Sequence, residues 1–348
     1  MAISMDVFYF GSLFFVSFFI THLVCRYADQ LGLVQAPNHR SSHTLPTPHS
    51  GGIGIVLAGT CAGIYAVWGQ GAQGWIVLVL SLVLAMMGLR DDVSPLSARL
   101  RFMMQMMVYT LLLWTLGSFA DLWHTFAAQP YGGWCAVFFS GLLLLSGLWW
   151  ANLFNFMDGI DGLASAQAFF MLVMAASLGA LFSPQCMDTH LWLWMLGVAA
   201  ATAGFGVINW PPAKIFMGDV GSMYLAFFIF VSTQLSIQER WLTYPVWLIL
   251  GAVFIVDATI TLLRRMIRGE RWFEAHRSHI YQQLARRLRA HRPVTVLTII
   301  INVMWLAPLA WASLAYPYWA WYCVMVAYVP LIVCAIFFDV DLRKRLHA

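Results

Sequence analysis

The composition of this chain indicates an integral membrane protein. Of its 348 residues, 61% are hydrophobic and only 10% are charged, and the mean hydropathy is +0.76. Soluble domains usually carry about 25% charged residues, so a soluble protein of ordinary composition is excluded. Lys and Arg outnumber Asp and Glu by 19 to 15. These charges lie between the hydrophobic runs, and this distribution argues against a nucleic-acid-binding protein.

Eleven hydrophobic segments follow one another along the chain. Each is close to the roughly 20 residues that a helix needs to cross a bilayer, or reaches that length with its flanking residues. They cover residues 7–25, 52–68, 75–89, 103–118, 135–151, 163–182, 191–208, 222–237, 244–263, 294–314 and 318–338. No repeat, low-complexity tract or linker separates them. The sequence therefore predicts an all-α helical bundle, with residues 1–348 forming a single polytopic membrane domain.

The distribution of Lys and Arg predicts how the bundle is oriented. Eleven crossings place the two termini on opposite sides, and basic residues are expected in the cytoplasmic loops. With the N-terminus outside, every Lys and Arg except Arg240 faces the cytoplasm. The same cytoplasmic loops hold most of the Pro, Gly, His, Asn and Asp residues, so we expect the chemistry on that side.

Six acidic residues lie at the cytoplasmic ends of predicted spans. They are Asp91 and Asp92 in GLRDD, Asp158 and Asp161 in NFMDGIDGLA, Asp219 in FMGDVGS, and Asp257. A single Asp in such a place commonly caps a helix or forms a turn. Adjacent carboxylates, however, repel each other unless they share a proton or a cation. Mg²⁺ binds a few carboxylates together with phosphate oxygens, so the pattern predicts a magnesium site for a phosphate-bearing substrate.

Two cytoplasmic loops add basic and polar side chains. The loop PNHRSSHTLPTPHSGG contains Asn38, His39, Arg40, His43 and His49, and the loop after the ninth segment contains His276, Arg277 and His279. A lone interfacial His usually has no special role, but five on the acid-bearing face favour donors to phosphate. A solvated salt bridge from Arg90 to its neighbours Asp91 and Asp92 is the simpler alternative for those two acids.

These motifs together resemble the polyprenyl-phosphate N-acetylhexosamine-1-phosphate transferases, which start the synthesis of O-antigen, enterobacterial common antigen and peptidoglycan lipids. The matching stretches, in order, are PNHRSSHTLPTPHSGG, GLRDD, NFMDGIDGLA, FMGDVGS and HRSHIYQ. The resemblance implies that a UDP-sugar donates its sugar 1-phosphate to undecaprenyl phosphate, releases UMP and uses Mg²⁺, with Mn²⁺ as an alternative. It also implies a multi-pass protein of the bacterial inner membrane in contact with lipid, N-terminus periplasmic and C-terminus and active site cytoplasmic. A homodimer is compatible with the sequence.

The resemblance also implies roles for individual residues. The metal ligands would be Asp219 and Asp92. Asp91 and Asp92 would orient or deprotonate the acceptor phosphate, and the other catalytic residues would be Asp158, Asp161 and His279. Phe216 would stack on uracil, with ordinary interfacial packing as its alternative, and Asn209 would contact the base. The remaining expected substrate contacts are Asn38, Arg40, His43, Asn155, His276 and Arg277.

Two positions depart from the family pattern. Many relatives carry Lys where this chain has Ser41, so Arg40 and His43 would share its charge. Relatives that transfer N-acetylglucosamine often have a His-rich run where this chain reads HIYQ, and Tyr281 and Gln282 are therefore expected to shape the sugar pocket. The variant resembles the branch that starts O-antigen with N-acetylfucosamine or N-acetylquinovosamine. UDP-N-acetylglucosamine as donor is the alternative.

A membrane transporter is the alternative from another functional class. Transporters place ionisable residues near the middle of the bilayer, whereas the acids here lie at the ends of the spans. For the transferase we favour direct attack over a covalent Asp intermediate, because the acceptor is already a phosphate. The sequence does not fix the exact sugar, the polyprenyl length or the oligomeric state.

Overall fold

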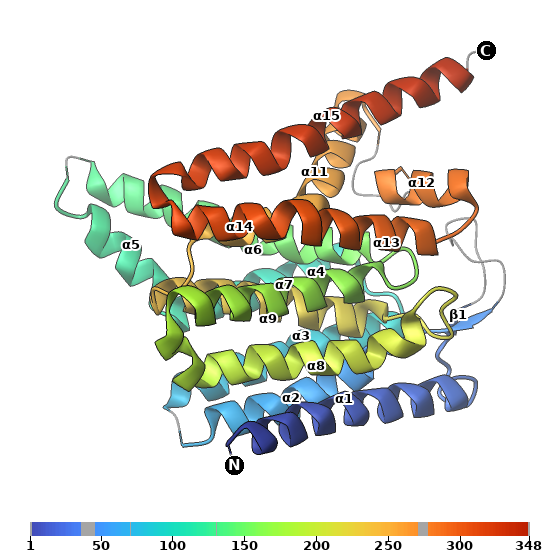
Figure 1. Cartoon of the computed structure of the whole chain (residues 1–348), viewed down its shortest axis with the longest axis horizontal. Helices are drawn as coiled ribbons and strands as arrows, with labels where there is room; N and C mark the ends of the chain where they lie inside the picture. Colours follow the sequence, from blue (N-terminus) through green and yellow to red (C-terminus); the bar gives the residue numbers. More distant parts are fainter. Residues whose placement is uncertain (1, 36–45, 70, 130, 271–277, 347–348) are drawn as a thin grey trace.

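The computed structural model of the chain is a bundle of long helices (Figure 1). It describes residues 2–346 apart from 36–45, 70, 130 and 271–277. In chain order the helices are α1 (Ala2–Tyr27), α2 (Ile53–Val67), α3 (Ala72–Val93), α4 (Ala98–Thr115), α5 (Ser118–Phe126), α6 (Gly132–Met157), α7 (Leu163–Phe182), α8 (His190–Asn209), α9 (Gly218–Gln238), α10 (Tyr244–Leu250), α11 (Ala252–Ile267), α12 (Ile280–Leu288), α13 (Arg292–Ile301), α14 (Ala307–Ala315) and α15 (Ala320–Leu346). Short 3₁₀ turns cover Pro184–Asp188 and Pro317–Trp319, and a π-helical turn, Asn302–Leu306, joins α13 to α14.

Eight helical segments of the described chain are long and apolar enough to cross a membrane. They are α1, α3, α6, α7, α8, α9, α13 with α14, and α15. The pairs α4 with α5 and α10 with α11 bend by 63° and 73° at short breaks, and they raise the number to ten if each pair is one span. The remaining predicted segment, 52–68, is α2, whose 15 residues are fewer than the roughly 20 that a straight crossing needs. The predicted class, an all-α polytopic membrane protein, is confirmed.

Helix α9 lies in the interior of the bundle. Most of its length is buried, 83% of the span, and it packs against α3, α6, α2 and α7. Its sequence is apolar around the whole circumference, as expected of a helix with no solvent-facing side. The first turn of α9, which contains Asp219, is therefore held in place on several sides.

A two-stranded pairing is the only β structure among the described residues. Strands β1 (Val34–Gln35) and β2 (Thr47–Pro48) are antiparallel, with Val34 opposite Pro48. The all-α prediction did not include it. The carbonyl of Pro48 also accepts the backbone N–H of Phe216 at 2.9 Å, so this pairing brings the segment before α2 next to the segment before α9.

The two termini lie at opposite ends of the bundle (Figure 1). Helix α12 and strand β1 lie at the end where the chain finishes, and α5 lies at the other end. The side of the membrane that each end faces remains a prediction.

Candidate active site

Three carboxylates meet where α3 ends and α9 begins. Asp91 and Asp92 occupy the last turn of α3, and Asp219 occupies the first turn of α9. The two helices approach closely because Gly88 has no side chain: a Cβ at this position would collide with the backbone carbonyl of Asp219. The motifs GLRDD and FMGDVGS, which are far apart in the sequence, thus lie side by side, and their grouping agrees with the sequence prediction.

Asp92 caps the N-terminus of α9. Its Oδ1 accepts the backbone N–H of Asp219 at 2.8 Å, and its Oδ2 accepts the backbone N–H of Val220 at 3.4 Å and the hydroxyl of Ser50 at 2.7 Å. Gly218 has φ +76° and lies against this carboxylate, so a side chain there would be both strained and obstructed. The carboxylate satisfies N–H groups that a helix start leaves without partners.

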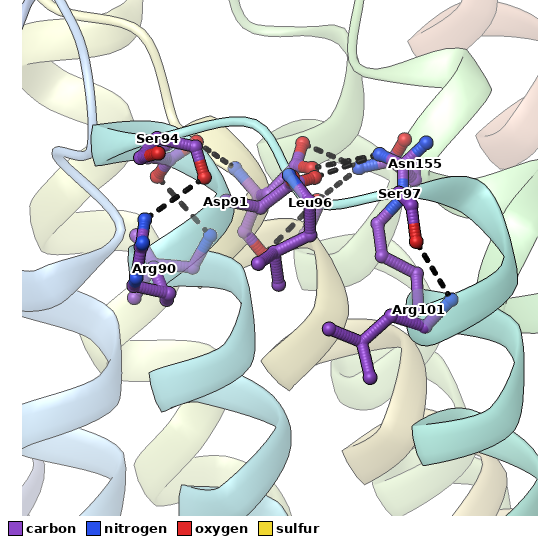
Figure 2. Close-up of polar contacts among 12 residues, drawn as sticks. Arg90, Asp91, Ser94, Leu96, Ser97, Arg101 and Asn155 are labelled. Carbon is purple, nitrogen blue, oxygen red and sulfur yellow. Dashed lines mark hydrogen bonds and ion pairs between the residues drawn. The ribbon is translucent and has the colours of Figure 1, made fainter.

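Asp91 pairs with Arg101, from the first turn of α4. The guanidinium of Arg101 donates to Oδ2 of Asp91 at 2.7 Å and lies 3.7 Å from Oδ2 of Asp219. Arg90 instead donates to the carbonyl of Ser94 at 3.0 Å. Among the described residues, Asp91 therefore forms its salt bridge with Arg101 and not with Arg90, and the alternative that assigned this contact to Arg90 is wrong. Figure 2 shows Asp91 between Arg90 on one side and Asn155 on the other.

Asn155, near the end of α6, connects a third helix to the carboxylates. Its amide nitrogen donates to Oδ1 of Asp219 at 2.8 Å and to the hydroxyl of Ser222 at 3.0 Å. The structure therefore places this predicted substrate contact against the predicted metal ligand. Arg101 and Asn155 between them contact both oxygens of Asp219.

The two Asp residues of NFMDGIDGLA have different surroundings. Asp158 follows the last residue of α6, and burial together with the nearby carboxylates of Asp219, Asp92 and Asp161 raises its pKa well above the ordinary range. Burial alone would also raise the pKa of Asp161. For Asp161, however, His291 at 3.0 Å and the backbone N–H of Ala213 at 3.0 Å lower the pKa below its usual value. Asp161 thus fixes the loop, while Asp158 retains a proton more readily.

His279 forms a buried pair with Asp257, and its ring lies 6.1 Å from the ring of Phe156, close to the end of α6. Its Nδ1 is 3.2 Å from Oδ1 of Asp257, which also accepts the backbone N–H of Ile280 at 3.0 Å. The other carboxylate oxygen accepts the backbone N–H of Tyr281 at 2.9 Å. Asp257 lies in α11, and its carboxylate therefore holds the first turn of α12 against that helix.

Tyr281 packs against the loop that contains Asp158. The sequence led us to expect that it would line a sugar pocket, but its side chain is buried and lines no open pocket. Its side chain is only 4% exposed, and its hydroxyl donates to the carbonyl of Phe156 at 2.8 Å. A Cβ at Gly159 would collide with this hydroxyl and lie 3.0 Å from the amide nitrogen of Gln282. Tyr281 can therefore influence a substrate only through the position of the loop that contains Asp158.

Asn209 and Phe216 occupy the neighbouring connection between α8 and α9. The amide of Asn209 is 3% exposed; it accepts the backbone N–H of Gly162 at 3.0 Å and donates to the carbonyl of Ile215 at 2.9 Å. These bonds give Asn209 a positioning role, and its contact with a base remains a prediction. Phe216 is half-buried, and its carbonyl accepts the backbone N–H of Gly51 at 2.9 Å.

Five predicted substrate contacts lie outside the described residues. They are Asn38, Arg40, His43, His276 and Arg277. In turn, the structure adds residues to which the sequence assigned no role, namely Ser50, Arg101, Ser222, Asp257 and His291. Arg101 had a recognisable signal, because it lies in the first turn after the Ser97 helix cap, on the helix that follows GLRDD.

The donor set around Asp219 suits Mg²⁺. The described residues contain no group of three or more His, Cys, Asp or Glu side chains arranged around a metal position. Mg²⁺ commonly uses one or two carboxylates and completes its octahedron with water and substrate phosphates. Asp219 fits this requirement better than Asp92, because the oxygens of Asp92 already accept three hydrogen bonds from the protein.

An apolar cavity of about 440 Å³ lies beside the loop between α6 and α7, which contains Asp158 and Asp161. It is bounded by α7, α8 and the π-helical turn. Gly162 and Ser165 are at its edge next to the loop, and Phe169, Val173 and Val303 line its apolar wall. Such a lining suits a hydrocarbon chain and not a nucleotide or a sugar.

The fold and the site define a polytopic membrane protein with a carboxylate-rich centre at one end of its bundle. Residues 74–237, which include that centre, match the family described as Glycosyl transferase family 4. The "Probable undecaprenyl-phosphate N-acetylglucosaminyl 1-phosphate transferase" of Bacillus subtilis (strain 168) is 31% identical over 81% of this chain and 77% of its own length. The chain belongs to glycosyl transferase family 4.

Two further relatives cover similar shares. The "Undecaprenyl-phosphate alpha-N-acetylglucosaminyl 1-phosphate transferase" of Escherichia coli (strain K12) is 29% identical over 75% of this chain and 71% of its own length. The "Decaprenyl-phosphate N-acetylglucosaminephosphotransferase" of Mycobacterium leprae (strain TN) is 27% identical over 81% of this chain and 77% of its own length. Membership in a transferase family does not favour the transporter alternative.

Proposed function

We propose that this protein transfers N-acetylhexosamine 1-phosphate from a UDP-sugar to undecaprenyl phosphate and releases UMP. The observation that carries the proposal is the convergence of Asp91, Asp92 and Asp219 with Asn155 and Arg101 in a member of this family. The relatives are named for polyprenyl-phosphate acceptors and an N-acetylglucosaminyl or N-acetylglucosamine phosphate group. The apolar cavity beside the loop is compatible with a lipid acceptor.

The proposed reaction is one direct displacement. An oxygen of the lipid phosphate attacks the phosphorus that bears the sugar, a new P–O–P linkage forms, and the bond to the UMP oxygen breaks with its electron pair leaving on UMP. Mg²⁺, or Mn²⁺, held by Asp219 would supply positive charge to the donor diphosphate. Asp91, held by Arg101, or Asp92 accepts any proton remaining on the attacking phosphate. Asp158, which lies near Asp219 and Asp92, would contact a phosphate or sugar oxygen of the donor.

A release assay tests the activity directly. Purified protein in lipid nanodiscs, supplied with undecaprenyl phosphate, Mg²⁺ and a panel of UDP-linked N-acetylhexosamines, is expected to release UMP and form a lipid diphosphate sugar in equal amounts. Omitting undecaprenyl phosphate is the control and should stop UMP release. A protein that moved substrates without producing UMP would contradict the transferase proposal.

The sugar is proposed to be a 6-deoxy-N-acetylhexosamine, which would make the protein an initiator of O-antigen synthesis. The support is the HIYQ stretch, in which Tyr281 supports the Asp158 loop. Through the position of this loop, Tyr281 would shape a sugar site in which one methyl group more or less is worth about 10- to 200-fold in discrimination. We therefore expect kcat/KM for UDP-N-acetylfucosamine or UDP-N-acetylquinovosamine to exceed that for UDP-N-acetylglucosamine by about tenfold or more. The opposite preference would overturn the branch and leave the family activity standing.

We propose that the protein spans a bacterial inner membrane and that the end of the bundle with the carboxylate site lies on the cytoplasmic side. In a variant without the six native cysteines, Leu288→Cys on α12 and Tyr318→Cys before α15 place single thiols at opposite ends of the bundle. Both positions are exposed. An impermeant maleimide added to intact spheroplasts should label Tyr318→Cys only, and permeabilised cells should label both. Labelling of Leu288→Cys in intact spheroplasts would reverse the orientation.

A further inference from the structure

The short segment before α2 makes a hydrogen-bonded connection to the carboxylate site. His49 and Ser50 lie between β2 and α2, and their side chains are 9% and 0% exposed. The backbone N–H groups of Gly51 and Gly52 donate to the carbonyls of Phe216 and Met217, each at 2.9 Å. The segment is therefore held alongside the residues that lead into α9.

The backbone of Ser50 is shaped for this contact. Its φ is +63°, in the left-handed region where a non-glycine residue is uncommon. Residues with such backbone strain persist where surrounding structure requires them, often at functional sites. Here the unusual φ accompanies a hydroxyl that reaches Oδ2 of Asp92 at 2.7 Å.

The hydrogen-bond directions form a chain of three side chains. Because the hydroxyl hydrogen of Ser50 is donated to Asp92, the contact of 2.8 Å between Nδ1 of His49 and this hydroxyl oxygen requires a hydrogen on Nδ1. His49 therefore donates to Ser50, and Ser50 donates to Asp92. Asp92 in turn accepts the backbone N–H of Asp219 through its other oxygen.

We infer that His49 and Ser50 are positioning residues that fix the rotation of the Asp92 carboxylate and, through it, the first turn of α9 that contains Asp219. This inference rests on the proposed function for its kinetic consequence. Hydrogen bonds to charged groups are the stronger ones. Three partly buried donors, the Ser50 hydroxyl and the backbone N–H groups of Asp219 and Val220, together fix the orientation of the Asp92 carboxylate. Loss of the chain should disturb the reacting carboxylates and leave the binding of nucleotide and lipid largely unchanged.

Ser50→Gly is the first test, because glycine adopts the observed φ without strain and removes the side chain that bears the hydroxyl. We expect kcat to fall about 10- to 100-fold, the loss typical of one hydrogen bond to a charged group, with the KM for the UDP-sugar changed less than about threefold. A wild-type kcat in this variant would overturn the inference. An equal rise in KM with constant kcat would also overturn it.

A pair of substitutions at His49 separates hydrogen bonding from packing. His49→Asn retains a nitrogen donor at the place of Nδ1, whereas His49→Gln moves the donor one carbon further out. We expect His49→Asn to keep kcat within about threefold of wild type and His49→Gln to lose about tenfold or more. Equal effects from both variants would show that His49 only fills space.

Hydrogen–deuterium exchange gives a readout that does not depend on activity. The amides of Asp219 and Val220, which donate to Asp92, should exchange faster in Ser50→Gly and His49→Gln than in wild type and in His49→Asn. Unchanged exchange in all variants would overturn the inference. Absence of UMP release by wild-type protein would contradict the proposed function instead, and the exchange data would still decide the role of His49 and Ser50.

Discussion

Asp219→Asn is expected to lower kcat by about 100-fold or more while the protein folds and inserts normally. The substitution removes the charge that suits Asp219 to hold Mg²⁺, whose stabilisation of phosphoryl charge is worth several kcal/mol, and each 1.36 kcal/mol is a factor of ten. Asn retains an oxygen that can accept from Asn155, and the close approach at Gly88 involves the backbone of residue 219, which the substitution leaves unchanged. The loss should therefore appear in turnover and not in thermal stability.

A matched control and a metal titration accompany this variant. Asp121→Asn changes an exposed acid on α5, at the other end of the bundle, and should leave activity unchanged. Chelator should abolish wild-type activity, and Mg²⁺ or Mn²⁺ should restore it. Near-normal turnover of Asp219→Asn, or activity that neither ion restores, would exclude Asp219 as the metal ligand.

The grouping of Asp91, Asp92 and Asp219 could be predicted because hydropathy alone places them at the same ends of spans. The contacts that each of these carboxylates makes could not be predicted in the same way. Arg90 is adjacent to Asp91 in sequence, yet its side chain is directed to Ser94, and Arg101 on the next helix takes the contact. Which arginine reaches a carboxylate depends on helix rotation and on the turn between α3 and α4, and neither is encoded in local spacing.

Hydrogen bonds between segments that are distant in the chain also could not be predicted from the sequence. Asn209 could be recognised as a polar residue near a motif, but its bonds to Gly162 and Ile215 depend on how two loops pack. The capping of α9 by Asp92 depends likewise on the approach of α3 that Gly88 permits. The hydropathy pattern specified the class of fold because it reflects burial in lipid, whereas the site depends on contacts between side chains from several helices.

Gly159→Ala is expected to reduce activity by about tenfold or more, because its new methyl group would occupy the place of the Tyr281 hydroxyl. Forcing extra volume into a packed site typically costs about 1–3 kcal/mol. Either Tyr281 leaves its bond with the carbonyl of Phe156, or the loop containing Asp158 moves away from the reacting carboxylates. Gly141→Ala in α6, the helix that leads into this loop, is the control, since a Cβ there has no neighbour within 4 Å.

Tyr281→Phe decides whether that loss arises from the predicted contact. Alone, it removes one hydrogen bond to a backbone carbonyl and should cost about threefold to tenfold in kcat/KM. Combined with Gly159→Ala, it vacates the position of the hydroxyl, so the double variant should be more active than Gly159→Ala alone. Recovery would be partial, because the ring carbon that bears the hydroxyl still lies 3.1 Å from the new Cβ. Purely additive losses in the double variant, or a Gly159→Ala protein as active as Gly141→Ala, would show that α12 does not set the position of the Asp158 loop.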